Sequence, residues 1–489
     1  MKILFYYNSV YYPGIALLSS FLRERGHVTD LLFDPAIGNN HYLDVPLMNR
    51  LISKKALIQK AKNFKPDLIA FSFVTNQFID MQLTGRWLKK EISVPLITGG
   101  THSTIMPEQV INEDWVDMVC IGEGEYALLE LVEKMSSGKD YKGISNLWVK
   151  DSSGYIHKNS LGKLIQNLDD LPFADMDIFE QYGLIYERID IITGRGCTNA
   201  CSFCINSFKK KLYRGETYLR RRSPRNVIQE LIQVKKKYKP KSFRFLDDTF
   251  AYDIDWLHEF GQDYNKHIAL PYRCTLNPVV TDAGIISILK QSKCESVTMG
   301  LQSASSRVRS EIMNRFHTNS KIVEISDLLK KNKINMSVDL IFGTPTETPD
   351  EMMETIDFCS TLNLKSVTPS FFYPFPKTTL TEKCLNEGFL NCELYNKAIN
   401  GEGSYHTTLL LNHPYKEDVY KYQAITPLYI KSGRLFKMFF KWMLNRRYGI
   451  IHRFFHLISV PLNEFYEFRR RIVMIPRVIR KTRKIVKKL

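Results

Sequence analysis

Short apolar runs alternate with amphipathic stretches along the first 140 residues of the chain. Four runs have the length and continuous apolar character of buried strands: Ile3–Tyr7, Asp67–Phe73, Val94–Thr98 and Met118–Ile121. Three stretches between them space their apolar residues about 3.6 apart, as helices do: Ala16–Arg25, Phe78–Lys90 and Glu125–Met135. Strand and helix in alternation predict a doubly wound parallel sheet in residues 1–140.

The alternation resumes after a connector at residues 141–188, in which Asp151–Gly154 has the composition of a hairpin turn. Six strands are predicted between residues 189 and 375: Ile191–Thr193, Ser242–Leu246, Pro271–Thr275, Ser296–Met299, Met336–Phe342 and Val367–Phe372. The helices between them are predicted at Pro224–Tyr238, Thr281–Gln291, Ser320–Asn332 and Pro349–Leu362. Six β/α units predict a full or partial TIM barrel, whose chemistry lies at the carboxyl ends of the strands. The pattern of residues 376–430 defines no element.

The chain of 489 residues has the composition of a globular protein, with 44% hydrophobic and 24% charged residues. Its start does not resemble a secretory signal, and no run reaches the about 18 apolar residues that a spanning helix needs. We therefore expect a cytoplasmic protein. Nine cysteines are too few and too unevenly spaced for a disulfide scaffold, and we expect six of them to pack as buried apolar side chains.

The other three cysteines lie within eight residues, directly after the first strand of the predicted barrel. Cys197, Cys201 and Cys204 have the spacing C-x3-C-x2-C, and Gly194 and Gly196 allow the backbone to approach closely. Three thiolates on one loop can hold an Fe–S cluster and leave one iron without a protein ligand. The alternatives are a zinc site or unrelated loop cysteines, but zinc usually takes four ligands and no partner pair lies nearby.

This loop resembles the signature of the radical SAM superfamily, C-x3-C-x-aromatic-C, with Phe203 in the aromatic position. The resemblance implies a [4Fe–4S] cluster on the three cysteines, whose open iron chelates S-adenosylmethionine (SAM) through its amino and carboxylate groups. One electron from the reduced cluster then cleaves SAM and yields a 5′-deoxyadenosyl radical. A reduced flavodoxin or ferredoxin is the implied electron donor.

Other segments at strand ends resemble the SAM-contacting elements of this superfamily. Asp247 and Asp248 end the second barrel strand, where one carboxylate is expected to receive the SAM ammonium, although a helix cap is the alternative. The implied SAM contacts after the fourth and fifth strands are Gly300, Gln302, Ser303 and Gly343. Arg315 is expected to pair with the SAM carboxylate, and a structural salt bridge is equally compatible with the sequence. The segment Tyr373–Thr378 departs from the usual Pro-Gly-Thr turn of the superfamily.

The domain ahead of the barrel resembles the Rossmann-like cobalamin-binding domain of one large radical SAM subgroup. That subgroup includes anaerobic Mg-protoporphyrin monomethyl ester cyclases and cobalamin-dependent methyltransferases. The residues that carry the resemblance are Ser72, Gly99, Gly100, Thr101, Gly122 and Glu123. The D-x-H-x-x-G motif that supplies an axial histidine is absent, so the resemblance implies base-off cobalamin without a histidine ligand. His102 is expected to be a turn residue or a contact to the nucleotide tail of the cofactor rather than a cobalt ligand. A domain that binds nothing is the alternative.

The net charge of +17 comes almost wholly from residues 431–489, which carry 17 Lys and Arg against Glu464 and Glu467. Aromatic and aliphatic side chains alternate with these cations, which predicts a basic amphipathic helical tail. Such helices lie on anionic membranes, where each Lys or Arg adds about 1 kcal/mol. We therefore predict a peripheral association with the inner face of the cell membrane. RNA binding and a solvated tail that covers the barrel are the alternatives; the abundant apolar residues favour the membrane.

Together these elements predict a radical SAM enzyme, and the leading hypothesis is a cobalamin-dependent methyltransferase acting on an unactivated carbon of an apolar or lipid-like substrate. Such a reaction uses one SAM to make methylcobalamin and a second to abstract a substrate hydrogen. The alternatives are a cyclase, oxidoreductase or C–C bond-forming radical SAM enzyme, with or without working cobalamin. A membrane-associated Fe–S binding module is the alternative outside the enzymes. Methylthiotransferases fit poorly because their N-terminal domain carries three further cysteines, whereas here only Cys120 precedes the loop.

Overall fold

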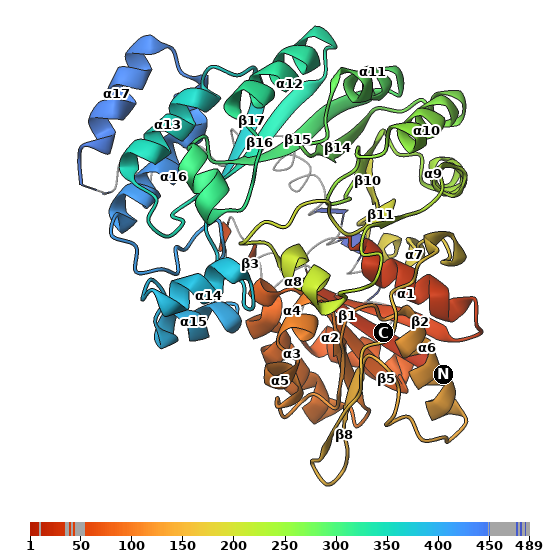
Figure 1. The fold of residues 1–489 in the computed structure, drawn as a ribbon. Coiled ribbons are helices and arrows are strands. Elements are labelled where there is room, and N and C mark those ends of the chain that lie inside the picture. The colour runs from red at the N-terminus through yellow and green to blue at the C-terminus, as the bar shows by residue number, and fades with distance from the viewer. Residues whose placement is uncertain are drawn as a thin grey trace. The chain divides into compact units, whose positions relative to one another are not determined.

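The computed structural model describes residues 1–8, 11–34 and 54–447, together with positions 39–40, 43–44, 449, 476–477, 480–481 and 485. These residues form two compact units (Figure 1). The first comprises Met1–Tyr186, Ala398–Glu402 and the described positions after residue 471, and the second comprises Glu187–Lys397 and the described residues from Gly403 to Gly449. The domain boundaries predicted at residues 140, 188, 375 and 430 stay predictions.

Five parallel strands form the centre of the first unit, in the order β2-β1-β5-β6-β7. They are β1 (Lys2–Asn8), β2 (Val28–Asp34), β5 (Leu68–Ser72), β6 (Leu96–Gly99) and β7 (Met118–Cys120). The antiparallel strands β8 (Leu147–Lys150) and β9 (Ile156–Lys158) extend the sheet. The predicted doubly wound sheet is confirmed. The strand order reverses between β1 and β5, the switch point at which sheets of this kind bind ligands.

Three strands of this sheet were missed by the sequence pattern. Strand β2 lies at the edge, where Thr29 and Asp30 interrupt the apolar run, and β8 and β9 are too short to show a period. The turn between β8 and β9 was predicted correctly. Its Asp151 accepts hydrogen bonds at Oδ1 from the backbone N–H of Ser153 (2.9 Å) and of Tyr155 (3.1 Å), the usual role of aspartate in a turn.

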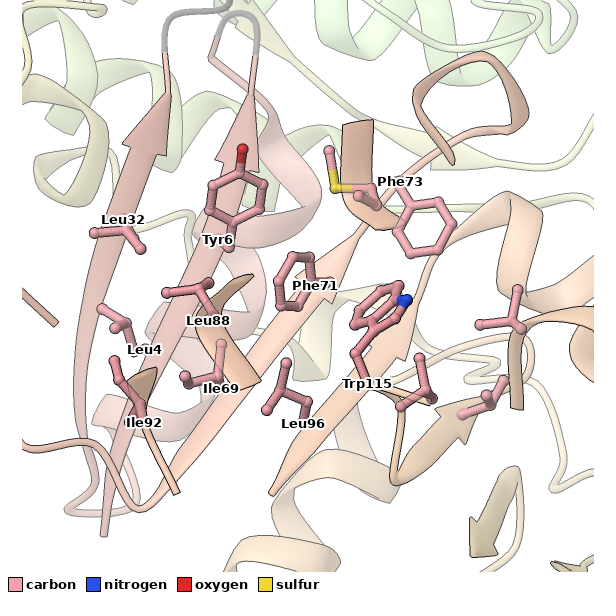
Figure 2. Packing of buried hydrophobic residues seen from close by; sticks show 14 of the residues in the cluster. Leu4, Tyr6, Leu32, Ile69, Phe71, Phe73, Leu88, Ile92, Leu96 and Trp115 are labelled. Carbon is pink, nitrogen blue, oxygen red and sulfur yellow. The ribbon is translucent and has the colours of Figure 1, made fainter. Parts of the chain in front are cut away.

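The helices of the first unit are α1 (Pro13–Arg23), α2 (Lys54–Phe64), α3 (Phe78–Glu91), α4 (Thr101–Ile105), α5 (Pro107–Ile111), α6 (Glu125–Ser136) and α7 (Asp177–Glu180). One apolar cluster joins α3 to the sheet, and Figure 2 shows Phe71, Leu88 and Trp115 within it. Helix α3 approaches so closely that a Cβ on Gly85 would lie 2.1 Å from Trp115 Cε3. Packing therefore requires glycine at position 85.

Six parallel strands form one sheet in the second unit, in the order β10-β13-β14-β15-β16-β17. They are β10 (Arg188–Ile191), β13 (Ser242–Phe245), β14 (Tyr272–Leu276), β15 (Cys294–Gln302), β16 (Asn335–Phe342) and β17 (Leu364–Phe371). Two-residue ladders occur at β3 (Asn39–Asn40) with β4 (Leu43–Asp44) and at β11 (Gly194–Arg195) with β12 (Arg220–Arg221). The predicted (β/α)6 partial barrel is confirmed, and the cysteine loop follows its first strand.

The helices of the barrel are α8 (Ile205–Leu212), α9 (Pro224–Tyr238), α10 (Ile254–His267), α11 (Ala283–Gln291), α12 (Asn319–Lys331) and α13 (Pro349–Cys359). Helix α9 has the bounds that the sequence predicts, because Ser223 caps it and Pro224 occupies its first turn. The Ser223 hydroxyl accepts a hydrogen bond from the backbone N–H of Asn226 (3.2 Å). Helix α10 was not predicted, although Asp253 caps it in the same way.

The C-terminal extension is helical, with α14 (Thr379–Asn386), α15 (Cys392–Ile399), α16 (Lys416–Lys431) and α17 (Arg434–Leu444). In the part of the chain that the structure describes, no helix is both long and apolar enough to span a bilayer. Most of the predicted basic tail, from residue 450 onward, lies outside the described residues.

Candidate active site

The three cysteines lie in the loop between β10 and α8, where Cys201 is buried and Cys197 and Cys204 are half-buried. Gly196 gives this loop its path. It has a φ of +94°, and a Cβ at this position would lie 2.4 Å from the carbonyl oxygen of Tyr218. A left-handed conformation and a close backbone approach together require glycine there.

Side chains from outside the loop hold its middle in place. Asn277 donates from Nδ2 to Thr198 Oγ1 (2.8 Å) and to Asn199 Oδ1 (3.0 Å). Lys210 of α8 donates from Nζ to the carbonyl oxygens of Thr198 (3.2 Å) and Asn199 (3.3 Å). The turn between the first two cysteines is therefore fixed from both the barrel and α8.

The Cys204 thiol lies in an environment that disfavours its free thiolate. The pKa of Cys204 is raised to about 11, mainly by burial; the backbone N–H of Asn206 opposes this rise, and Cys201, Asp248 and Cys197 contribute to it. A bound cation reverses this preference, since metal coordination favours the deprotonated thiol. The Cys197 sulfur accepts a hydrogen bond from the backbone N–H of Asn199 (3.5 Å) and lies 3.5 Å from Thr249 Oγ1.

No three His, Cys, Asp or Glu side chains among the described residues stand close enough together to hold one metal ion. A zinc site needs its ligands to meet on a single ion. In a [4Fe–4S] cluster each cysteine binds a different iron, and the sulfurs stand further apart. Three thiols on one loop, with backbone and hydroxyl donors beside them, fit the cluster.

Asp247 is buried and holds the start of the cysteine loop. Its Oδ1 accepts hydrogen bonds from the backbone N–H of Thr193 (2.9 Å), from Thr193 Oγ1 (3.1 Å) and from the backbone N–H of Gly194. Burial raises the pKa of Asp247 to about 6, and Arg221 opposes that rise. Its Oδ2 has no hydrogen-bond partner within the described ranges.

Asp248 differs from its neighbour because it is exposed. Its Oδ2 accepts a hydrogen bond from Asn206 Nδ2 (3.0 Å), and Asn206 Oδ1 accepts one from the Tyr218 hydroxyl (2.6 Å). Although the residue is open to solvent, the protein atoms around the carboxylate desolvate it and raise its pKa. Helix α8 and the segment before β12 therefore orient a carboxylate that ligands can reach.

Arg315 links the cysteine loop to the fourth barrel strand. Its Nη1 donates to the Cys201 sulfur (3.2 Å) and its Nη2 to the carbonyl oxygen of Gly300 (2.5 Å). Its buried Nε finds no acceptor among the residues described. The strand is irregular at this point, since Gln302 has a φ of +68° and a Cβ on Gly300 would lie 2.6 Å from Gln302 Nε2. The structure thus brings Gly300, Gln302 and Arg315 together beside Cys201.

Ser303 and Gly343 have structural partners. The Ser303 hydroxyl lies 3.2 Å from Thr355 Oγ1 and accepts a hydrogen bond from the backbone N–H of Ser305 (3.2 Å). Gly343 has a φ of +76°, and its N–H donates to Glu347 Oε2 (2.8 Å). These contacts explain both residues without a ligand, so their assignment to SAM stays a prediction.

The candidate cobalamin residues of the first unit lie at the carboxyl ends of β5, β6 and β7. A Cβ on Gly100 would lie 2.7 Å from the carbonyl oxygen of Phe73, and its φ is +90°. The Thr104 hydroxyl donates to the carbonyl oxygen of Gly100 (2.9 Å) and accepts from the N–H of Gly122 (3.0 Å). One threonine therefore ties the turns after β6 and β7 together and keeps both backbones close to the sheet edge.

The remaining candidates surround these turns. Ser72 ends β5 and pairs in register with Gly99 of β6, and Thr101 begins α4. Glu123 faces the connector instead, where its Oε2 accepts a hydrogen bond from the backbone N–H of Ile165 (2.9 Å). Small residues at the ends of adjacent parallel strands fit a large ligand at the sheet edge.

The cysteine loop with its barrel and the turns at the sheet edge correspond to two known domain families. Residues 191–359 match the radical SAM superfamily, and residues 6–132 match the B12 binding domain. The chain is a radical SAM enzyme with an N-terminal B12-binding domain. Neither match extends to the helices α14–α17 that follow the barrel.

Relatives of this radical SAM enzyme extend over most of the chain. An uncharacterized methyltransferase of Pyrococcus horikoshii is 28% identical over 390 residues, which are 77% of this chain and 79% of that protein. The anaerobic magnesium-protoporphyrin IX monomethyl ester cyclase of Rubrivivax gelatinosus is 24% identical over 383 residues, 76% of this chain and 65% of the cyclase. The structure of the methyltransferase TsrM of Kitasatospora setae was solved with tryptophan and a SAM analogue. It superposes on this chain with a TM-score of 0.63 at 16% identity, and the superposition covers 79% of this chain and 76% of TsrM. The likeness to TsrM shows a shared fold.

Two polar residues of the B12-binding domain are held inside the protein. His102 is buried, lies 4.5 Å from the Phe78 ring and has Nδ1 3.2 Å from Thr75 Oγ1. Burial lowers the pKa of His102 to about 3, so the imidazole is neutral. Asn8, the last residue of β1, accepts from Gln77 Nε2 (2.9 Å) and donates weakly to Asp80 Oδ2 (3.4 Å). The next two residues of that loop, at positions 9 and 10, lie outside the described residues.

Several residues that shape the radical SAM site were missed from the sequence. Asn206, Tyr218, Thr249 and Arg221 occupy ordinary polar positions, and only their spatial neighbours give them meaning. Glu347 could have been identified from the sequence, because it stands four residues after the glycine of a strand-end turn. It is fully buried, and burial raises its pKa to about 8, although Thr344 and Gly343 donate to it.

Proposed function

We propose that this protein is a cobalamin-dependent radical SAM methyltransferase that methylates an unactivated carbon of an apolar substrate. The observation that carries the proposal is the cysteine loop at the end of β10, in a chain that also has a B12-binding domain with glycine turns at its sheet edge. The similarity to the Pyrococcus methyltransferase supports methyl transfer. When bound, the cluster would supply the electron that cleaves SAM, and cobalamin would carry the methyl group.

In this proposal Cys197, Cys201 and Cys204 hold the cluster, and Asp248 rather than Asp247 receives the SAM ammonium. Asp247 already accepts three hydrogen bonds from the start of the loop, so its role is to position that loop. Asp248 is exposed and oriented by Asn206. Arg315 retains one N–H without an acceptor in the described structure, and that donor is suited to the SAM carboxylate.

Cobalamin would bind over the turns at Gly100 and Gly122, whose close backbone approach leaves room for a large ligand. No histidine occurs between Asn8 and Gly14. His102 is neutral but packs, tilted, against the Phe73 and Phe78 rings inside the domain. We therefore propose base-off cobalamin without a histidine ligand, with a reduced flavodoxin or ferredoxin as the external source of electrons.

The deciding experiment is anaerobic reconstitution with iron, sulfide and hydroxocobalamin, followed by desalting and incubation with SAM and dithionite. We expect about four irons per chain, retained cobalamin in a base-off optical spectrum, and 5′-deoxyadenosine as a product. The Cys201→Ala variant should lose iron and SAM cleavage, whereas Cys392→Ala, an exposed cysteine of α15, should retain both.

Cobalamin lost on desalting, with the cluster and SAM cleavage intact, would refute the methyltransferase assignment and leave a radical SAM enzyme. Full iron content and activity in Cys201→Ala would refute the cluster assignment. The cyclase alternative, supported by the similarity to the Rubrivivax protein, is distinguished by product mass, because ring closure removes hydrogens whereas methylation adds one carbon.

A further inference from the structure

We infer that helix α17 is a docking surface for an anionic lipid bilayer. The surface is one helix of eleven residues in the second unit, Arg434–Leu444. It is a small part of the basic tail, residues 431–489, that the sequence predicts to contact the membrane, and its binding requires no step of the proposed reaction.

One face of α17 carries an unusual density of exposed apolar side chains. Their exposed fractions are 81% for Leu435, 66% for Phe436, 63% for Met438, 42% for Phe439 and 51% for Trp442. Isolated exposed apolar residues are normal on a protein surface, but four of these five form a contiguous patch. With about 3.6 residues per turn, Leu435, Met438, Phe439 and Trp442 fall on one side of the helix. The Phe439 and Trp442 rings stack at 5.9 Å.

The opposite side of α17 is anchored to the protein. Phe440, Met443 and Leu444 are buried, and the Phe440 ring lies 6.4 Å from the ring of Tyr429 in α16. Lys421 of α16 donates from Nζ to the carbonyl oxygen of Leu444 (3.2 Å), which caps the end of α17. Figure 1 shows α17 in blue beside α16 and α13. The helix is therefore held with its second apolar side exposed to solvent.

The charges beside the exposed apolar side chains of α17 favour an anionic partner. Arg434, Lys437 and Lys441 lie along one edge of the helix, and the Arg446 guanidinium lies 4.8 Å from the Trp442 ring. Lys441 pairs with Asp357 of α13 (3.0 Å), but α17 itself contains no acidic residue. Apolar side chains flanked by cations are complementary to an anionic headgroup layer over hydrocarbon. An apolar protein partner would not need these cations.

The geometry also fixes how the helix binds. Eleven residues span about 16 Å, roughly half of a hydrocarbon core of about 30 Å. The helix therefore lies in the interface, with its aromatic side chains inserted and its cations at the headgroups.

The test is flotation of the full-length protein with vesicles of phosphatidylcholine alone or with phosphatidylglycerol. We expect binding to the anionic vesicles that weakens at high salt. The variant L435S/F439S/W442S should bind at least about tenfold more weakly. The matched control L83S/Y155S/V279S removes exposed apolar side chains elsewhere and should bind like the wild type. Reversal of charge in R434E/K437E should weaken binding, whereas K236E/K237E on exposed positions of α9 should have a smaller effect.

The inference would be overturned if the full-length protein did not bind anionic vesicles, or if wild type and the patch variant bound them equally. It would also be overturned by a wild-type dimer that the patch variant converts to a monomer. Iodide quenching of Trp442, measured against the W442F variant, adds a check in the absence of lipid. A protected Trp442 would show that this chain covers the patch itself. Tighter binding of single-stranded RNA than of vesicles, lost in the same variants, would assign the surface to nucleic acid. All of these assays work without iron, cobalamin or SAM, so their failure leaves the proposed reaction untouched.

Discussion

Replacement of Arg315 should lower the reduction potential of the cluster that Cys197, Cys201 and Cys204 are proposed to hold. The Arg315 guanidinium donates to the Cys201 sulfur at 3.2 Å and is fixed by a second hydrogen bond to Gly300. A cation that donates to a cluster sulfur stabilises the more negative, reduced state. Arg315→Gln removes this charge while a polar side chain remains, so the cluster should become harder to reduce.

The magnitude follows from Coulomb's law. The electron added on reduction is spread over the cluster, so its centre lies further from the guanidinium than the sulfur does. At about 6 Å and an effective dielectric constant of about 20, one unit charge contributes about 3 kcal/mol. Solvent and structural relaxation reduce this to about 1–3 kcal/mol, which corresponds to a shift of about 40–130 mV for one electron.

The assay is an anaerobic potentiometric titration of the reconstituted protein without SAM, followed by the electron paramagnetic resonance signal of the reduced cluster. Arg315→Lys keeps the charge but loses the paired N–H donors that contact Cys201 and Gly300. Its shift in reduction potential should therefore be smaller than that of Arg315→Gln. The control Arg214→Gln removes an exposed charge of the same type, for which we expect a shift under about 20 mV because solvent screens it. A full iron content in Arg315→Gln with a potential within about 20 mV of the wild type would refute this reasoning.

Three further perturbations test other parts of the structure. Gly100→Ala should abolish cobalamin retention on desalting while the iron content stays normal, because the new Cβ would lie 2.7 Å from the carbonyl oxygen of Phe73. The control Gly143→Ala should retain both cobalamin and iron, because no atom of the described structure lies within 4 Å of its Cβ. Gly85→Ala should destabilise the first unit by about 1–3 kcal/mol in urea denaturation, since overpacking against Trp115 outweighs the helix preference for alanine of about 1 kcal/mol. A stabilised variant would contradict the close packing. Burial raises the folded-state pKa of Glu347 to about 8. The free energy of unfolding should therefore fall as the pH rises from about 4.5 to 8, because the carboxyl group ionises readily in the unfolded chain but not in the folded protein. Glu347→Gln should therefore gain stability relative to the wild type across that window, and a pH-independent difference in urea midpoints would contradict it.

The fold class could be predicted from sequence because it depends on local periodicity. Central parallel strands are apolar throughout and helices repeat every 3.6 residues or so, so that short windows identify them without tertiary information. The elements that escaped prediction are those with weak local signals. Strand β2 is interrupted by Thr29 and Asp30, and α10 carries a polar outer face that hid its apolar side.

The cysteine loop could also be predicted, because all three ligands lie within eight residues and their spacing alone indicates the chemistry. Which of the two adjacent carboxylates is open to ligands could not be predicted. Asp247 and Asp248 are neighbours in sequence with the same chemistry, yet one is buried against the loop and the other is open to ligands. Successive residues at a strand end point in opposite directions, so the packing around each carboxylate decides its role.

By itself, then, the sequence determined the strand and helix alternation, the three-cysteine loop, the glycine turns and the basic character of the C-terminal region. Only the tertiary structure brought Arg315 to Cys201, two residues that stand 114 positions apart, and only it divided the apolar side chains of α17 into a buried set and an exposed set. The physical reason is common to both cases. Local sequence fixes which backbone conformation a segment prefers, whereas contacts between distant segments depend on how several elements pack at once, and no short window of sequence contains that information.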